Sequence, residues 1–147
     1  MKVLVAYDGS MQAKDALRYG LEKVRENGGE LVALHVFNSN LFVDYDAFGA
    51  EEVGRAESVR FVAEANKILR ETGKGINARV IVAEGYPEEE TIKYARANNV
   101  DLLLCSPRYK SIIRKFKKLL DKQGKKVQED TILDETEKPR LSVVSQR

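Results

Sequence analysis

The stretch Lys2–Ser10, KVLVAYDGS, decides the fold of this chain. Residues 3–6 are apolar without alternation, as in a strand that helices cover on both faces. This central strand leads directly into an amphipathic helical stretch, Met11 to Arg25. The last three residues of KVLVAYDGS supply a carboxylate, a glycine that permits a tight turn and a hydroxyl that caps the helix. Open α/β sheets bind ligands at such junctions, although a plain strand-to-helix turn explains the same three residues.

The chain has 147 residues, a length typical of one domain, which we expect to span residues 1–147. Its single cysteine, Cys105, rules out an internal disulfide and has no neighbouring ligands for zinc. The sequence shows neither an apolar signal region nor a run long enough to cross a bilayer. We therefore expect a cytoplasmic protein that does not associate with membranes.

Strand and helix patterns alternate along the rest of the chain. Further strands are expected at Glu30–Phe37, Asn77–Ala83, Val100–Cys105 and Leu141–Val144. Further helices are expected at Glu51–Thr72 and from Pro87 to about Asn98. This alternation predicts an α/β fold with a parallel sheet and right-handed crossovers.

Three stretches resemble the universal stress protein family, and together they extend the resemblance over nearly the whole chain. They are residues 2–17, KVLVAYDGSMQAKDAL, residues 30–36, ELVALHV, and residues 84–106, EGYPEEETIKYARANNVDLLLCS. The resemblance implies an open five-stranded parallel sheet in the order 3-2-1-4-5 with helices on both faces, an adenine nucleotide alpha hydrolase-like fold. It also implies a homodimer in which the exposed last strand, Leu141–Val144, pairs with its copy.

The resemblance assigns roles in binding a nucleotide. Asp8 would face the ribose, and Ala6, Tyr7 and Val36 would lie near the adenine. ATP-binding members carry Gly-x-x-Gly after the fourth strand and Gly-Ser or Gly-Thr nine residues later, because backbone N–H groups must approach the phosphates. This chain departs from the pattern at all four positions, which hold Ser106, Tyr109, Leu119 and Leu120. The triphosphate cradle is therefore missing or rebuilt.

A basic segment stands where that cradle would be. Between Arg108 and Lys126 there are nine Lys or Arg and one Asp, and between Glu129 and Glu137 five acids and no base. Beside Ser106, the cations Arg108 and Lys110 would bind phosphate by side-chain charge, forming an anion site that faces Asp8. A solvated helix face is the plainer interpretation. Nucleic acid is less favoured, since few aromatic residues interleave with the cations.

Other candidate residues have structural explanations. His35 lies in an apolar strand and is expected to be a hydrogen-bonded core residue. Cys105 ends a buried strand and is expected to act as a small hydrophobic residue. Four acids lie on or near a long connection without the order of metal ligands: Asp44, Asp46, Glu51 and Glu52. We expect no metal site.

Three functions are consistent with the residues. The first is a non-enzymatic regulatory or stress-response module that lacks the ATP loop and acts through a dimer surface or a protein partner. The second is a binding protein for ATP, ADP or AMP, or a slow ATPase, that uses the basic segment as a substitute loop. The third, an ATP-pyrophosphatase-type enzyme, ranks last because its Ser-Gly-Gly-x-Asp-Ser-like loop is replaced by Tyr-Asp-Gly-Ser-Met-Gln. No cofactor is required, and ATP, ADP or another phosphate-bearing ligand stays an alternative.

Overall fold

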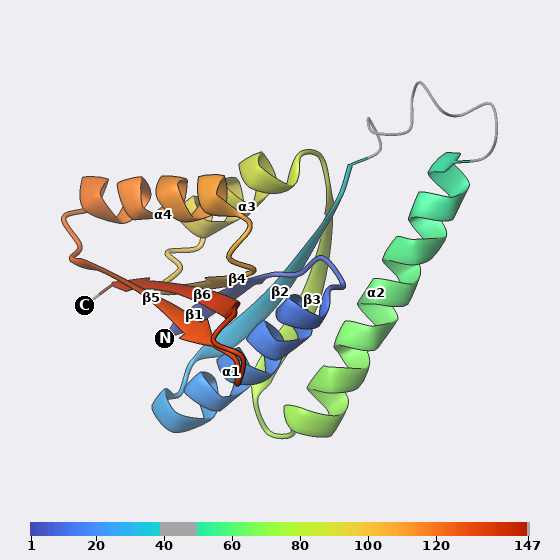
Figure 1. Ribbon diagram of the computed structural model, residues 1–147, viewed down its shortest axis with the longest axis horizontal. Helices are drawn as coiled ribbons and strands as arrows, with labels where there is room; N and C mark the ends of the chain where they lie inside the picture. Colours follow the sequence, from blue (N-terminus) through green and yellow to red (C-terminus); the bar gives the residue numbers. More distant parts are fainter. Residues whose placement is uncertain (39–49, 147) are drawn as a thin grey trace.

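The computed structural model describes residues 1–38 and 50–146 as one sheet with helices on both of its faces (Figure 1). The elements in chain order are β1 Lys2–Ala6, α1 Met11–Asn27, β2 Glu30–Phe37, α2 Ala50–Thr72, β3 Asn77–Glu84, α3 Pro87–Ala97, β4 Leu102–Cys105, α4 Lys110–Lys122, β5 Val127–Leu133 and β6 Pro139–Gln146. The predicted α/β architecture is confirmed.

The strand order is β3-β2-β1-β4-β6-β5. Strand β1 pairs in parallel with β2 and β4, and β2 pairs in parallel with β3. Four of the five residues of β1 are buried, as its unbroken apolar run predicts for a central strand. The order reverses at β1, so the carboxyl ends of β1 and β4 meet at one edge of the sheet.

The predicted order of the five strands and the parallel direction of the first four are confirmed, whereas the number of strands and the direction of the last one were wrong. A sixth strand, β5, was missed, and β6 runs antiparallel to both β4 and β5. The four residues Gln128–Thr131 at the middle of β5 are exposed, so this edge strand carries acids and shows no apolar alternation. The predicted last strand, Leu141–Val144, lies within β6 and has a neighbour on each side. It therefore offers no free edge to a second copy, and a homodimer through this strand is not compatible with the sheet.

The sheet separates two apolar cores. Helices α1 and α2 pack on one face, where Leu17 and Leu21 are fully buried beside Val5. Helices α3 and α4 pack on the other face, where Phe116 and Leu120 are fully buried beside Leu4. This double cover holds the ends of β1 and β4 in fixed positions.

Candidate functional site

The turn after β1 is built by short-range hydrogen bonds. The backbone N–H of Ser10 donates to Oδ1 of Asp8 at 3.0 Å, and the Ser10 hydroxyl accepts from the N–H of Ala13 at 3.1 Å. Gly9 has φ +79°, a left-handed conformation that favours glycine. A Cβ at Gly9 would lie 2.3 Å from Cδ1 of Phe61, so this position also lacks space for a side chain. The predicted turn and cap are thus both present.

Asp8 is bound by two residues that follow β4. The Arg108 guanidinium donates to Oδ2 of Asp8 at 2.5 Å, and the Tyr109 hydroxyl donates to the same oxygen at 2.5 Å. The guanidinium also lies 3.1 Å from the Tyr109 hydroxyl. We call these three residues, Asp8, Arg108 and Tyr109, the Asp8 cluster. It joins the carboxyl ends of β1 and β4 across the cleft between them.

The Asp8 cluster keeps its carboxylate ionised. Burial by itself would raise the pKa of Asp8, but hydrogen bonds from Ser10, Tyr109 and Arg108 outweigh it and hold that pKa below its usual value. Burial and the bond to Asp8 raise the pKa of the Tyr109 hydroxyl. The cluster is therefore a carboxylate paired with a cation and a neutral phenol at neutral pH.

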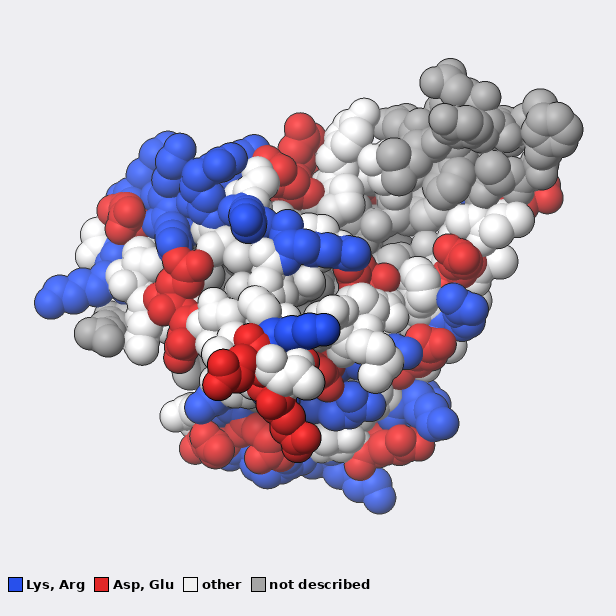
Figure 2. All heavy atoms as spheres, viewed as in Figure 1, with Lys and Arg blue, Asp and Glu red and all other residues white. Residues whose placement is uncertain are grey.

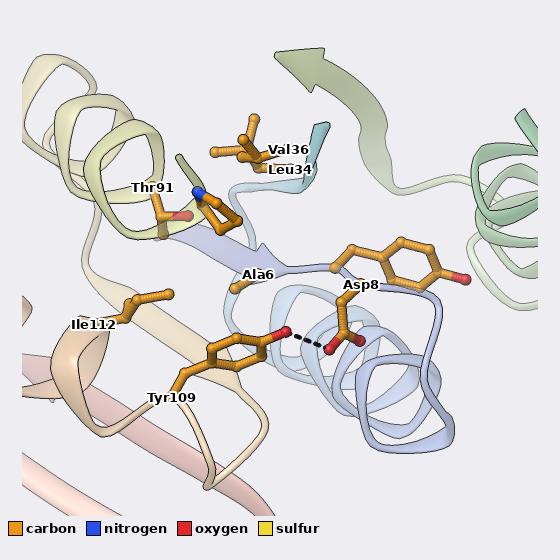
Figure 3. Close-up of a pocket in the computed structure, with 9 residues that line it drawn as sticks. Ala6, Asp8, Leu34, Val36, Thr91, Tyr109 and Ile112 are labelled. Atoms are coloured by element: carbon orange, nitrogen blue, oxygen red, sulfur yellow. Dashed lines mark hydrogen bonds between the residues drawn. The ribbon is translucent and has the colours of Figure 1, made fainter. Parts of the chain in front are cut away.

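A small cavity lies beneath this cluster (Figure 3). Its volume is about 40 Å³, far below the roughly 300–1,000 Å³ typical of ligand pockets, and it has room for only a few water molecules. Figure 3 shows the Tyr109 ring extending toward Asp8, with its hydroxyl bonded to the carboxylate. The lining residues are Ala6, Tyr7, Asp8, Leu34, Val36, Pro87, Thr91, Tyr109 and Ile112.

The predicted site residues fall into two groups. Ala6, Tyr7, Asp8 and Val36 line the small cavity. Arg108 and Lys110 line a neighbouring hollow of about 460 Å³ between the start of α3 and the start of α4. Only Arg108 of these two cations bonds to Asp8 in the described part of the chain.

Two further residues near this site have structural roles. Tyr7 lines the cavity, but its side chain packs in the core on the α1 and α2 face. Its ring therefore caps the end of β1. Ser106 is buried, and its carbonyl accepts the N–H of Tyr109 at 3.1 Å, which closes the turn before α4.

The positions of the family's second glycine pair lie inside α4. Leu119 is 8% exposed and Leu120 is fully buried, and both belong to the apolar face that packs on the sheet. Backbone N–H groups in a helix interior already bond to carbonyls one turn earlier and are not free for phosphate. A backbone cradle therefore cannot form at these two positions.

His35 and Cys105 agree with their structural interpretations. The Nδ1 atom of buried His35 lies 3.0 Å from the Tyr7 carbonyl, and Nε2 lies 3.0 Å from the Ser58 hydroxyl. Cys105 is fully buried, and burial raises the pKa of its thiol to about 12. Within residues 1–38 and 50–146, no three His, Cys, Asp or Glu side chains gather as metal ligands. Asp44 and Asp46 lie outside the described residues.

Tyr109 is the site residue whose role the sequence did not predict. In the sequence it stands out only as a replacement for glycine, whereas in the structure its hydroxyl bonds to Asp8 and its side chain lines the cavity. The available signal was a phenol placed directly after Arg108 at the start of a helix. The guanidinium carbon of Arg108 lies 5.0 Å from the centre of that ring.

Comparison with known proteins gives consistent matches. Residues 1–120 match the model of the universal stress protein family. A universal stress protein of Methanocaldococcus jannaschii is 24% identical over 107 residues, which cover 70% of this chain and 62% of that protein. The chain thus matches less than two thirds of the length of this relative.

Solved structures share the fold. The universal stress protein UspA of Lactobacillus plantarum superposes with a TM-score of 0.65 at 18% identity, covering 82% of this chain and 90% of that one. A family protein of Arabidopsis thaliana, solved with AMP bound, gives a TM-score of 0.57 at 21% identity, covering 80% and 84% of the two chains. None of the described helices is long and apolar enough to cross a membrane. By the match over residues 1–120 and by its fold, the chain belongs to the universal stress protein family.

Proposed function

We propose that this protein is a non-enzymatic regulatory module for stress response that does not hold ATP in a glycine-loop cradle. The observation that carries the proposal is the Asp8 cluster, in which the carboxylate expected to face a ribose is bound by Arg108 and Tyr109. An adenosine would have to displace both residues. The cavity of about 40 Å³ is too small for a purine while Tyr109 lies in this position.

The properties of Asp8 also argue against catalysis by this residue. Its pKa lies below the usual value, and a general base is most effective when its pKa is near the working pH. The buried His35 uses both ring nitrogens in contacts with Tyr7 and Ser58. We therefore expect no hydrolysis of ATP above the rate in buffer.

A second candidate function is the binding of an adenine mononucleotide in an opened form of the same cleft. Two observations favour it: Arg108 and Lys110 line the hollow beside Asp8, and a family relative was solved with AMP bound. In this alternative Arg108 leaves Asp8 to bind the phosphate, and Asp8 accepts a ribose hydroxyl. Each charge-assisted hydrogen bond would contribute roughly 1.5–3 kcal/mol.

Calorimetric titration with ATP and Mg²⁺ tests the first proposal. We expect no saturation below about 1 mM, which corresponds to about 4 kcal/mol of binding free energy. A dissociation constant in the low micromolar range, about 8 kcal/mol, would overturn it. Mass spectrometry of any ligand released from purified, denatured protein checks for a nucleotide that is already bound.

Titration with AMP separates the two candidates. If the cleft opens for AMP, replacing both Arg108 and Lys110 by alanine weakens binding, and more so at low salt. Replacing the exposed Lys67 and Lys74 by alanine removes the same charge from the α2 end of the molecule and serves as the control. Equal AMP affinities for the parent and the Arg108, Lys110 variant would exclude the second candidate.

A further inference from the structure

A wide, basic groove runs between α3 and α4, separate from the Asp8 cluster. Its volume is about 620 Å³. Figure 2 shows Lys and Arg side chains gathered over α4, which lies at the upper left as in Figure 1. Five cations and one acid line the groove, with Ile92 and Leu119 at its floor: Lys93, Arg96, Lys115, Lys118, Lys122 and Glu89.

Most of these cations have no acidic partner among the residues that the structure describes. Lys115 pairs with Glu88, whereas the other four form no ion pair within the described residues. By contrast, all four cations of α1 lie within 4.0 Å of a carboxylate: Lys14, Arg18, Lys23 and Arg25. Like charges three or four residues apart destabilise a helix by a few tenths of a kcal/mol per pair. The groove therefore concentrates positive charge at a small cost in stability.

The spacing of the cations suits a chain of phosphates. Lys115, Lys118 and Lys122 follow one another at three and four residues, so they form a row about 10 Å long on α4 at 1.5 Å per residue. Lys93 and Arg96 form a shorter row on α3, which packs beside α4. A nucleic-acid strand carries one phosphate per roughly 3.4 Å of helix axis and so presents about three phosphates over the longer row.

The buried apolar face of α4 and the lining of the groove limit which classes of ligand the groove can bind. Its apolar residues face the sheet and are buried, so no apolar side chain of α4 is free to enter a bilayer. In residues 1–38 and 50–146, no aromatic side chain lines the groove, so none is present there to stack on a base. The sequence made nucleic acid the less favoured partner because few aromatic residues interleave with the cations. This argument weighs against the stacking of bases, whereas binding to phosphates requires only cations.

We propose that the α3–α4 groove binds the phosphate backbone of nucleic acid without reading its sequence. The groove is distinct from the cleft at Asp8, so this activity does not depend on whether the protein binds a nucleotide there. Binding should be electrostatic and fall steeply with salt. A duplex, with its higher charge density, should bind at least as tightly as a single strand.

Fluorescence anisotropy with a labelled 20-base-pair duplex and a labelled oligothymidine of 20 residues tests the proposal. For four neutralised phosphates of a single strand, log K should fall with log salt at a slope of about −3. Replacing Lys93, Arg96, Lys118 and Lys122 by glutamine should weaken binding at low salt by more than tenfold and flatten the slope. A milder variant, Lys118→Gln with Lys122→Gln, should lie between the parent and this variant.

The matched control replaces Lys67, Arg70, Lys74 and Arg79 by glutamine. These four exposed cations lie on α2, on β3 and in the turn between them, and their loss lowers the net charge by the same four units. We expect this control to bind within twofold of the parent. Equal weakening of the two variants would mean that net charge alone governs binding, and the groove would be rejected as a site.

Two other probes address the class of partner. Vesicles of phosphatidylcholine with one third phosphatidylserine test an anionic membrane, and polyglutamate tests an acidic protein. Binding to either probe that is tighter than binding to the oligonucleotides would overturn the assignment to nucleic acid, provided that it is lost in the fourfold groove variant and kept in the control. Binding to both probes that is weaker than binding to the oligonucleotides supports the assignment. Circular dichroism establishes that each variant is folded.

Discussion

The Tyr109 hydroxyl lies 2.5 Å from Oδ2 of Asp8, although the two residues are 101 positions apart in the sequence. This bond connects the end of β1 to the first residues after β4. Together with the Arg108 guanidinium, it satisfies a carboxylate whose side chain is only 20% exposed. The bonds that stabilise this edge of the sheet are therefore the same ones that any ligand of Asp8 would have to displace.

The ionisation of Asp8 should make stability depend on pH. An aspartate in the unfolded chain has a pKa of about 3.9, and the pKa of Asp8 in the folded chain lies below its ordinary value. Its contribution is therefore present above about pH 4 and is lost as the pH falls through the folded-state pKa. We expect Asp8→Asn to lower the free energy of unfolding at pH 7 and to make its decline in acid shallower.

Urea denaturation of the parent and of Asp8→Asn at several pH values measures this difference. Asp121→Asn, which changes an exposed aspartate, is the control. An equally steep acid decline in the parent and in Asp8→Asn would show that other carboxyl groups dominate.

Gly9 and Gly124 offer a matched pair of substitutions. Both glycines have positive φ, +79° and +72°, so alanine is strained at either position. At Gly9 the new Cβ would also meet the Phe61 ring, whereas at Gly124 nothing lies within 4 Å. We expect Gly124→Ala to cost about 1 kcal/mol and Gly9→Ala to cost at least about 1–3 kcal/mol more, the usual penalty of overpacking. Equal losses in urea denaturation would argue that Phe61 moves aside freely.

Restoring the family's residues in α4 should not restore a phosphate cradle. We expect the double variant Leu119→Gly with Leu120→Ser to unfold far more easily than the parent and to gain no affinity for ATP. Leu120 is fully buried, and replacing a buried leucine by alanine alone costs about 2–5 kcal/mol. The exposed Lys118→Ala is the control and should change stability by less than about 0.5 kcal/mol. A folded double variant with micromolar affinity for ATP would refute this account of α4.

Removing β6 should destroy the fold rather than only an oligomer. Leu141 and Val144 are fully buried, and β6 supplies the pairing of both β4 and β5. A chain that ends at residue 138 should therefore lose its cooperative thermal transition in circular dichroism. A truncated chain that melts like the parent would contradict the six-stranded arrangement.

The homodimer stays a prediction, and β5 is the edge on that side of the sheet to which a second copy could add. The N–H of Thr131 donates at 2.9 Å to Oδ1 of the neighbouring Asp130, and edge strands tolerate proline, so Thr131→Pro should block the addition of a further strand while the sheet stays folded. We expect this variant to stay folded and to have the mass of a monomer in light scattering. A dimer of unchanged mass in the variant would place the contact elsewhere.

The central part of the fold was predictable because burial on both faces leaves a clear pattern. Unbroken apolar runs marked β1 and β4, and the three- and four-residue spacing in Met11–Arg25 marked α1. The pattern failed for β5, whose exposed acids resemble a polar connection. The place of β5 at the edge of the sheet was also unpredictable, because it depends on the hairpin that β5 forms with β6.

At the site, position in the topology predicted more than residue type did. The expectation that Asp8 and Arg108 face each other followed from the meeting of the ends of β1 and β4, and the structure brings the two side chains together. It did not foresee that Arg108 binds the carboxylate itself. Whether a side chain bonds to its neighbour or to a ligand depends on rotamers and distances that spacing along the sequence does not contain.

Arg108 and Tyr109 compete with any added ligand for Asp8, and they do so from within the same chain. Arg108 and Tyr109 meet Asp8 at an effective concentration set by the folded chain, so they cannot be diluted away. A nucleotide that needs the cleft open has an apparent affinity reduced by the fraction of molecules in which it is open, about tenfold weaker when that fraction is about one in ten. The residues at positions 108 and 109 thereby set the nucleotide concentration at which the cleft would begin to fill.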